Sequence, residues 1–384
     1  MPTFTSEHDT FRRMVRQFVD NEIQPYVDEW ERAGVFPAHD LFAKLGELGL
    51  LGIEYDPEYG GQGADHLYTA IACEEFGRID AGGIAMAIGV QTNMATPSLH
   101  RFGSHELKQK YLAPAIKGEM VCSIAVTEAD AGSDVAGLRT RAVRSGDDWI
   151  INGSKLYITN GTQADWICLL ARTSDEGGYK GFSQIIVPTS TPGFKVSRKL
   201  DKLGMRCSDT AELSFVDMRV PVANTIGEIG RGFQQQMTQF QNERMSAAYD
   251  RVGALQQALD RTRDYLKTRR AFGRPLIENQ HLAFRLAELY AQVDMLRHYN
   301  YACADAYMKG EDTTRFATIA KLTIGRLSTA VAQTCLQFHG GIGYMEELWT
   351  ARFFRDMALT SIGGGADEVM LQVLTKLEGL HADR

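Results

Sequence analysis

The sequence predicts an α+β protein that is mostly helical, with a small β-domain between two helical parts. Up to about residue 119, apolar residues recur at three- and four-residue spacing, which is the period of an amphipathic helix. The period changes to two over residues 120–224 and then returns to long helical runs. A chain of 384 residues is also longer than one core usually accommodates. We therefore expect three domains, over residues 1–119, 120–224 and 225–384.

Each part shows its own elements between glycine, proline and aspartate breaks. The N-terminal part has helical patterns in FRRMVRQFVDNEI, HDLFAKLGELGLLG, LYTAIACEEFGRI and ELKQKYLAPAI. The middle part has strand patterns in VCSIAVTE, RTRAVRS, DWIING, KLYITN, DWICLLART, FSQIIVP and AELSFVDMRVP. The last part has three long helical runs that begin at GFQQQ, HLAFR and DTTRF, and their lengths suit a four-helix bundle.

Composition excludes several classes of function. The chain has 41 basic and 48 acidic residues, a formal net charge of -7, so no electrostatic attraction draws it to nucleic acid or to an anionic membrane. Six cysteines lie scattered without CxxC spacing, as in the reduced thiols of a cytosolic protein, and we expect no metal site. We find no signal-peptide pattern and no apolar run of membrane-spanning length, and we expect a cytoplasmic protein.

Two neighbouring segments of the middle part carry the strongest functional signal. Residues 123–135 read SIAVTEADAGSDV, and Asn152 to Gly161 read NGSKLYITNG. Together they would form a shelf of apolar and aromatic side chains edged by hydroxyls and loop amides, which suits a flat, polar-rimmed ring such as a flavin. Either segment alone also fits a buried strand followed by a surface loop. The pair favours the flavin.

In this order the two segments resemble the flavin-binding middle of the acyl-CoA dehydrogenase family, and the resemblance runs through almost the whole chain. It implies the fold of that family and FAD as cofactor. It implies that Thr127 bonds the pyrimidine end of the flavin and that the Thr159 hydroxyl lies at flavin N5. Ser133 would lie near both the cofactor and the CoA chain. The positions against the ring would be Ile124, Val126 and Tyr157.

Two residues of these segments depart from the family pattern. Asp130 stands where a proline is common, and Tyr157 stands where a tryptophan is common. Both substitutions keep the shelf plausible.

A second group of residues resembles the family's site for the ADP half of FAD, which is completed across a subunit interface. An arginine offers forked donors to a pyrophosphate, and adjacent glycines let backbone amides approach it. The glycines also read as the cap of a long helix, and both uses can hold at once. No GxGxxG follows a predicted strand, so a nicotinamide-binding domain has no support. The matching residues are Arg269, Phe272, Gln280, Gln337, Gly340 and Gly341.

The prediction of the catalytic base begins from a glutamate that the C-terminal loop lacks. Many members of the family carry a catalytic glutamate in a loop reading Tyr-Glu-Gly-Thr, whereas the matching stretch here is SIGGGADEVMLQ, with Gly364 in the glutamate's place. Long-chain and isovaleryl members instead place the glutamate on a helix just before an arginine. This chain has that pair as Glu243 and Arg244 in QFQNERMSAAY.

Helical geometry favours the same residue. Arg244 falls within an apolar stripe of the helix, and Glu243 lies about 100° further round, at the edge of the stripe. The alternative is a solvated Glu-Arg pair on a helix surface. The missing loop glutamate and the arginine on the buried side favour catalysis. The stripe consists of Phe233, Met237, Phe240, Ala248, Val252 and Leu255.

The base must remove the weakly acidic α-proton of a thioester, so we expect its carboxylate in a largely apolar pocket that raises its pKa. The resemblance implies that the backbone N–H of Gly364 and a flavin ribityl hydroxyl hold the thioester oxygen. We therefore assign substrate contacts to Ser133, Arg244, Gly364 and Gly365. In the same loop Ala366 stands where a threonine usually contacts the cofactor, and Glu368 occupies a second cofactor-contact position.

The resemblance implies FAD-dependent α,β-dehydrogenation of an acyl-CoA to a trans-2-enoyl-CoA, as in β-oxidation. It also implies a homotetramer built as a dimer of dimers, with an electron-transferring flavoprotein as electron acceptor. The glycine at position 364 empties volume above the α and β carbons, so we expect a branched or medium to long chain, such as isovaleryl-CoA or citronellyl-CoA.

Two alternatives remain open. One is an acyl-CoA oxidase or a flavin monooxygenase on the same fold. The other is a DNA-binding homologue without dehydrogenase activity, which calls for a basic C-terminal surface, while LTKLEGLHADR is mixed in charge.

Overall fold

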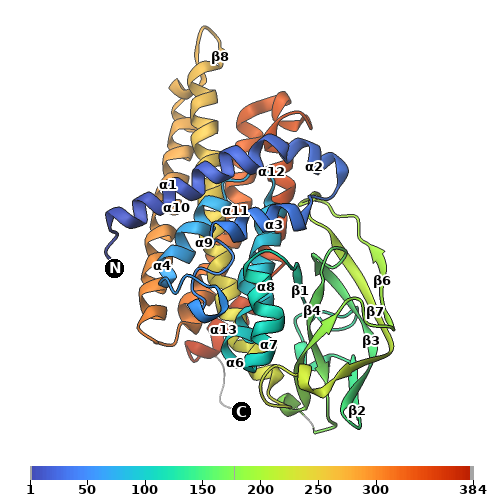
Figure 1. Ribbon diagram of the computed structural model, residues 1–384. Coiled ribbons are helices and arrows are strands. Elements are labelled where there is room, and N and C mark those ends of the chain that lie inside the picture. Colours follow the sequence, from blue (N-terminus) through green and yellow to red (C-terminus); the bar gives the residue numbers. More distant parts are fainter. Residues whose placement is uncertain (1, 177, 381–384) are drawn as a thin grey trace.

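The computed structural model describes residues 2–176 and 178–380. It is mostly helical, and a sheet formed by the middle of the chain lies to one side of the helices (Figure 1). The N-terminal part consists of helices α1 Ser6–Phe18, α2 Val27–Ala33, α3 Ala38–Glu47, α4 His66–Phe76, α5 Gly82–Gly89, α6 Pro97–Phe102, α7 His105–Leu107 and α8 Ala113–Ile116.

The four predicted helical patterns correspond to α1, α3, α4 and the run from α7 to α8. The helical stretch from α5 through the short π-helix η4, Val90–Ala95, to α6 was not predicted from the sequence. Most residues of α5 are buried, so this helix has no polar face and its sequence has no amphipathic period.

The middle of the chain forms a seven-stranded sheet. Its strands are β1 Cys122–Ala125, β2 Arg141–Ser145, β3 Asp148–Thr159, β4 Trp166–Arg172, β5 Phe182–Pro188, β6 Phe194–Lys199 and β7 Thr210–Pro221. The order is β1-β4-β2-β3-β7-β6, and β5 pairs with β4. DWIING and KLYITN, which we predicted as two strands, form the single strand β3. Its pairing with β7 shifts register at Gly153 and again between Lys155 and Ile158. Strand β6 was not predicted because four of its six side chains are exposed and three are charged, which leaves little apolar alternation.

The C-terminal part consists of α9 Gly232–Thr268, α10 Gln280–Met308, α11 Thr314–His339, α12 Trp349–Met357 and α13 Asp367–Leu377. Helix α9 packs against α10, α11 and α4, and the shorter α12 and α13 pack against α11. A small hairpin of β8 Arg270–Ala271 and β9 Arg274–Pro275 joins α9 to α10 and projects beyond the helices (Figure 1). Among the helices of the described residues, none is both long and apolar enough to cross a membrane.

One carboxylate connects the three parts of the chain. Asp356 at the end of α12 is buried, and its two oxygens accept from the N–H of Gly82 at 2.9 Å and the N–H of Met205 at 2.5 Å. These donors belong to α5 and to the segment before β7. The helices and the sheet are therefore held together by a specific polar contact as well as by apolar packing. The division into domains at residues 119 and 224 stays our interpretation.

Candidate active site

The two segments that we predicted to form a shelf lie side by side. The Ser123 hydroxyl donates to the carbonyl of Thr159 at 2.5 Å, and the N–H of Leu156 donates to the carbonyl of Thr127 at 2.8 Å. Tyr157 keeps 66% of its surface exposed and has a φ of 62°, a conformation uncommon outside glycine. The register shift of β3 at this point turns the ring out of the sheet's core.

Around Tyr157, Ile124, Val126 and Thr159 are partly exposed. Ser133 lies on an exposed loop after β1. Apolar and aromatic groups are thus open to a ligand beside the Thr127 and Thr159 hydroxyls, which donate to no acceptor within residues 2–176 and 178–380.

A buried ion pair that the sequence analysis missed supports this shelf. Lys155 is fully buried, and its Nζ donates to the Val126 carbonyl at 2.7 Å and to Glu128 Oε1 at 2.9 Å. Glu128 also accepts from the N–H groups of Arg139 and Thr140. Burial lowers the pKa of Lys155 to about 8, and the charge of Glu128 opposes that shift. If side chains alternated strictly between the two faces of β3, counting back from the buried Ile158 would place Lys155 on the outer face. The register shift in β3 reverses that direction.

Glu243, the proposed base, lies on α9 beside the C-terminal glycine loop, residues 363–365. A Cβ atom built on Gly364 would lie 3.5 Å from Oε1 of Glu243. The Glu243 carboxylate is partly buried and makes no hydrogen bond or ion pair with any described residue. Burial raises its pKa to about 7, against the opposing charges of Arg244 and Lys321. An unpartnered carboxyl with this pKa is typical of a general base.

The glycine loop meets the next residue of the helix as well. A Cβ atom built on Gly365 would lie 3.8 Å from Nε of Arg244, a buried nitrogen that has no acceptor in the described part of the chain. The φ angles of Gly364 and Gly365 are 65° and 102°, which favour glycine at both positions. The N–H of Gly364 likewise has no acceptor among the described residues. Ala366 directly precedes α13 and makes no side-chain cap, and Glu368 lies exposed in the first turn of that helix.

Apolar packing joins the shelf to the helix of the base. Val126 of the shelf packs against the same buried cluster as Met237 and Phe240 of α9. Phe240 lies three residues before Glu243 and so on a neighbouring part of the same helix surface. The fold therefore brings the β1 shelf, α9 and the glycine loop into one region.

The residues predicted for the ADP half of FAD lie elsewhere in this chain. Arg269, Phe272 and Gln280 are exposed just before, on and after the β8–β9 hairpin, which projects away from the sheet (Figure 1). Phe272 is fully exposed. Gln337 and Gly340 lie near this hairpin, because Tyr265 at the end of α9 stacks on His339 with ring centroids 4.3 Å apart. Gly340, with a φ of 65°, ends α11.

Gly340 and Gly341 are bordered by open space, since a Cβ atom built on either would meet no atom within 4 Å. Within one chain these residues do not reach the shelf.

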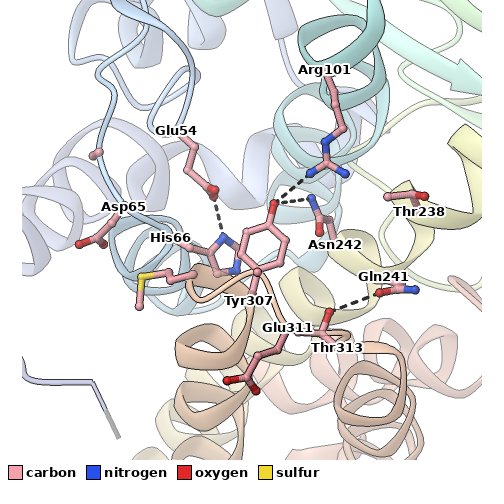
Figure 2. A pocket seen from close by; sticks show the side chains of 13 residues that line it. Glu54, Asp65, His66, Arg101, Thr238, Gln241, Asn242, Tyr307, Glu311 and Thr313 are labelled. Atoms are coloured by element: carbon pink, nitrogen blue, oxygen red, sulfur yellow. Dashed lines mark hydrogen bonds and ion pairs between the residues drawn. The ribbon is translucent and has the colours of Figure 1, made fainter.

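A separate polar pocket of about 600 Å³ lies on another side of α9 and contains none of the predicted site residues (Figure 2). Arg101 Nη2 and Asn242 Nδ2 both donate to the hydroxyl of Tyr307, each at 3.3 Å. His66 Nδ1 pairs with Glu54 at 2.7 Å. Several of the polar groups that line this pocket are paired with one another, in contrast to the Glu243 carboxylate, which has no partner among the described residues. No cluster of three or more His, Cys, Asp or Glu side chains that could hold a metal occurs in the described residues.

Comparison with known proteins decides the family. Models described as the N-terminal, middle and C-terminal domains of acyl-CoA dehydrogenase match residues 5–119, 123–218 and 230–377. The chain belongs to the acyl-CoA dehydrogenase family.

Relatives match over almost the full length. The mitochondrial isovaleryl-CoA dehydrogenase of Solanum tuberosum is 37% identical, over 97% of this chain and 90% of its own. The mitochondrial long-chain specific acyl-CoA dehydrogenase of Rattus norvegicus is 36% identical, over 97% and 86%. The crystal structure of a "probable acyl CoA dehydrogenase" from Mycobacterium abscessus superposes with a TM-score of 0.94 at 41% identity, covering 98% of this chain and 99% of that one.

This acyl-CoA dehydrogenase is an enzyme whose family implies FAD as cofactor, an acyl-CoA as substrate and an electron-transferring flavoprotein as partner. The residues present fit FAD. The shelf offers an exposed aromatic ring and two hydroxyls that are free among the described residues, and the end of α11 offers open space beside glycine backbone.

Proposed function

We propose that this acyl-CoA dehydrogenase converts a branched or medium- to long-chain acyl-CoA, such as isovaleryl-CoA or citronellyl-CoA, to its trans-2-enoyl-CoA, with Glu243 as the base. The observation that carries the proposal is the unpartnered Glu243 carboxylate, with its raised pKa, beside the backbone of Gly364. A carboxylate that is partly buried and lacks partners costs free energy, which a binding or catalytic role explains.

In this mechanism Glu243 takes the proton from C2 of the thioester as the C2–H bond breaks. The electron pair forms the C2–C3 double bond while the hydrogen on C3 leaves as hydride. The N–H of Gly364, which has no acceptor among the described residues, donates to the thioester oxygen and stabilises the developing negative charge. FAD, when bound, supplies the acceptor for the hydride.

The substrate class follows from the side chain that position 364 lacks. A glycine there leaves the space beside Glu243 Oε1 to the substrate, and a methyl branch on C3 would use it.

We assign the remaining roles by position. The flavin ring would contact Ile124, Val126, Thr127, Tyr157 and Thr159, with Ser133 between cofactor and CoA. The ADP half would contact Arg269, Phe272, Gln280, Gln337, Gly340 and Gly341 of a second subunit in a homotetramer, with Ala366 and Glu368 as further cofactor contacts. Arg244 and Gly365 would line the substrate site.

We also propose an electron-transferring flavoprotein as the physiological acceptor and the cytoplasm as the location. All six cysteines are free and buried thiols, as in a reducing compartment.

The test is an anaerobic titration of the purified, yellow protein with isovaleryl-, citronellyl- and straight-chain acyl-CoAs. We expect bleaching of the flavin by branched or longer chains. A clear preference for short linear chains would reject the substrate class, and no bleaching by any acyl-CoA would reject the function. Rapid peroxide release under air would instead favour the oxidase alternative.

A further inference from the structure

Lys321 is a buried lysine that the function has not yet used. It lies on α11 with 1% of its surface exposed. Its Nζ donates to the carbonyl of Thr360 at 2.6 Å and to the carbonyl of Gly365 at 3.0 Å. These two acceptors lie on either side of Gly364, so a single ammonium group connects both ends of the glycine loop.

The loop has few other restraints. It contains three glycines in succession, residues 363–365, and the N–H groups of Ile362 and Gly363 both donate to the carbonyl of Leu359. Glycine loses more conformational freedom on folding than any other residue, so such a loop needs an external contact to hold one geometry. Lys321 supplies that contact from a rigid helix.

The same lysine lies close to the base. A Cβ atom built on Gly364 would lie 3.6 Å from Cε of Lys321 and 3.5 Å from Oε1 of Glu243. The stem of Lys321 and the carboxylate of Glu243 therefore both border the space into which a side chain at position 364 would extend. Gly364, whose N–H would hold the thioester oxygen, and Glu243, which would take the proton, are therefore both adjacent to Lys321.

The charged groups around Lys321 come from α9 and α13. Glu243, Arg244 and Arg251 face it from α9, and Asp367 faces it from α13. Burial lowers the pKa of Lys321 to about 8, while Asp367 and Glu243 oppose this shift. Around Glu243 itself, Arg244 and Lys321 are the cations that favour the ionised form.

We infer that Lys321 is a positioning residue for the dehydrogenation. Its hydrogen bonds hold the Gly364 N–H in place for the thioester oxygen, and its positive charge favours the ionised form of the Glu243 carboxylate. This inference rests on the proposed function of Glu243. It separates two effects, since the hydrogen bonds to the loop carbonyls fix geometry and the positive charge acts on the carboxylate.

The variants Lys321→Met, Lys321→Gln and Lys321→Arg separate these effects. Methionine removes the charge and both donors, glutamine keeps a donor without the charge, and arginine keeps both. Arg326→Gln is the matched control, because Arg326 lies exposed on the same helix and loses the same charge. Each protein is first checked for bound flavin and for thermal midpoint.

The measurement is the rate of anaerobic flavin reduction by acyl-CoA from pH 5.5 to 9. Removing a nearby cation makes the carboxylate harder to ionise, so we expect the midpoint of the rise to move to higher pH by about 0.5 to 1 unit in both neutral variants. The methionine variant should also slow at its optimum by about tenfold or more. Arginine should keep the midpoint near that of the unaltered enzyme, and Arg326→Gln should change neither value.

The outcomes distinguish a failure of the inference about Lys321 from a failure of the proposed role of Glu243 as the base. If Glu243→Gln still reduces flavin at a near-native rate, the base assignment fails. If Glu243→Gln is inactive while flavin-loaded Lys321→Gln and Lys321→Met keep the native midpoint and rate, the inference about Lys321 alone is overturned. Should the methionine variant not fold, the glutamine variant decides by its midpoint.

Discussion

Glu243 of α9 and Gly364 of the C-terminal loop converge on one point, since a Cβ atom built on the glycine would lie 3.5 Å from Oε1 of the glutamate. The residues are far apart in sequence but adjacent in the fold. A carboxylate extended from either backbone position would reach the same volume, so the base can belong to the helix while the loop contributes only its backbone.

This convergence predicts a partial rescue. Glu243→Gln should lower the rate of anaerobic flavin reduction by about 10²-fold or more, because the base is lost. Adding Gly364→Glu should restore part of that rate. The restoration is incomplete because a side chain at a φ of 65° costs about 1–2 kcal/mol. Gly364→Ala in the same background carries the backbone strain without a carboxylate, and equal recovery in that control would disprove the convergence.

The pH dependence of catalysis follows from the burial of Glu243. A base must be deprotonated, and burial raises its pKa from an ordinary 4.5 to about 7. We therefore expect kcat/KM to be low at pH 5 and to rise through about pH 7. Steady-state rates across that range at constant ionic strength check this. A rise already complete at pH 5.5 would mean that the carboxylate is solvated in the working enzyme.

Lys155→Met tests the ion pair beneath the shelf. The change leaves the buried Glu128 without its cation, so we expect a loss of about 3–5 kcal/mol in the free energy of unfolding. We also expect flavin to be lost on dialysis, since Val126 loses the bond to its carbonyl. Lys195→Met, an exposed lysine of β6, is the control. Urea unfolding and flavin content measure both effects, and unchanged flavin retention would show that the pair does not support the shelf.

Asp356→Ala tests how the three parts of the chain are held together. The change leaves the N–H groups of Gly82 and Met205 without their acceptor, so we expect the free energy of unfolding to fall by about 2 kcal/mol or more. Asp28 is an exposed aspartate that pairs with Arg352, and Asp28→Ala should cost much less. Thermal unfolding of both variants is the measurement. Equal losses would contradict a special role for Asp356.

Phe272→Ala tests the exposed hairpin. The side chain is fully exposed in this chain, so the stability of a monomer should change by no more than about 0.5 kcal/mol. If a second subunit uses Phe272 to cover FAD, flavin affinity should fall while the fold survives. Equilibrium dialysis with FAD, together with sedimentation of the variant, measures this. An unchanged affinity and oligomeric state would remove Phe272 from the cofactor site.

Several features were accessible from sequence because they depend on local pattern. That the two shelf segments lie side by side could be predicted because each is short and contiguous, and the proposal of Glu243 as the base followed from the glycine at position 364. Lys155 was missed because a register shift in β3 reverses the direction that alternation assigns. Lys321 was missed because its acceptors, Thr360 and Gly365, lie about forty residues further along the chain.

In the mechanism that we propose, Glu243 removes the α-proton of an acyl-CoA bound against the flavin. The most direct measurement is anaerobic stopped-flow bleaching of flavin-loaded enzyme and of its Glu243→Gln variant by the best acyl-CoA of the panel. We predict that both proteins retain yellow colour and bind the ligand, and that the variant bleaches at least about 10²-fold more slowly than the unaltered enzyme. Rapid bleaching of the variant would contradict the claim.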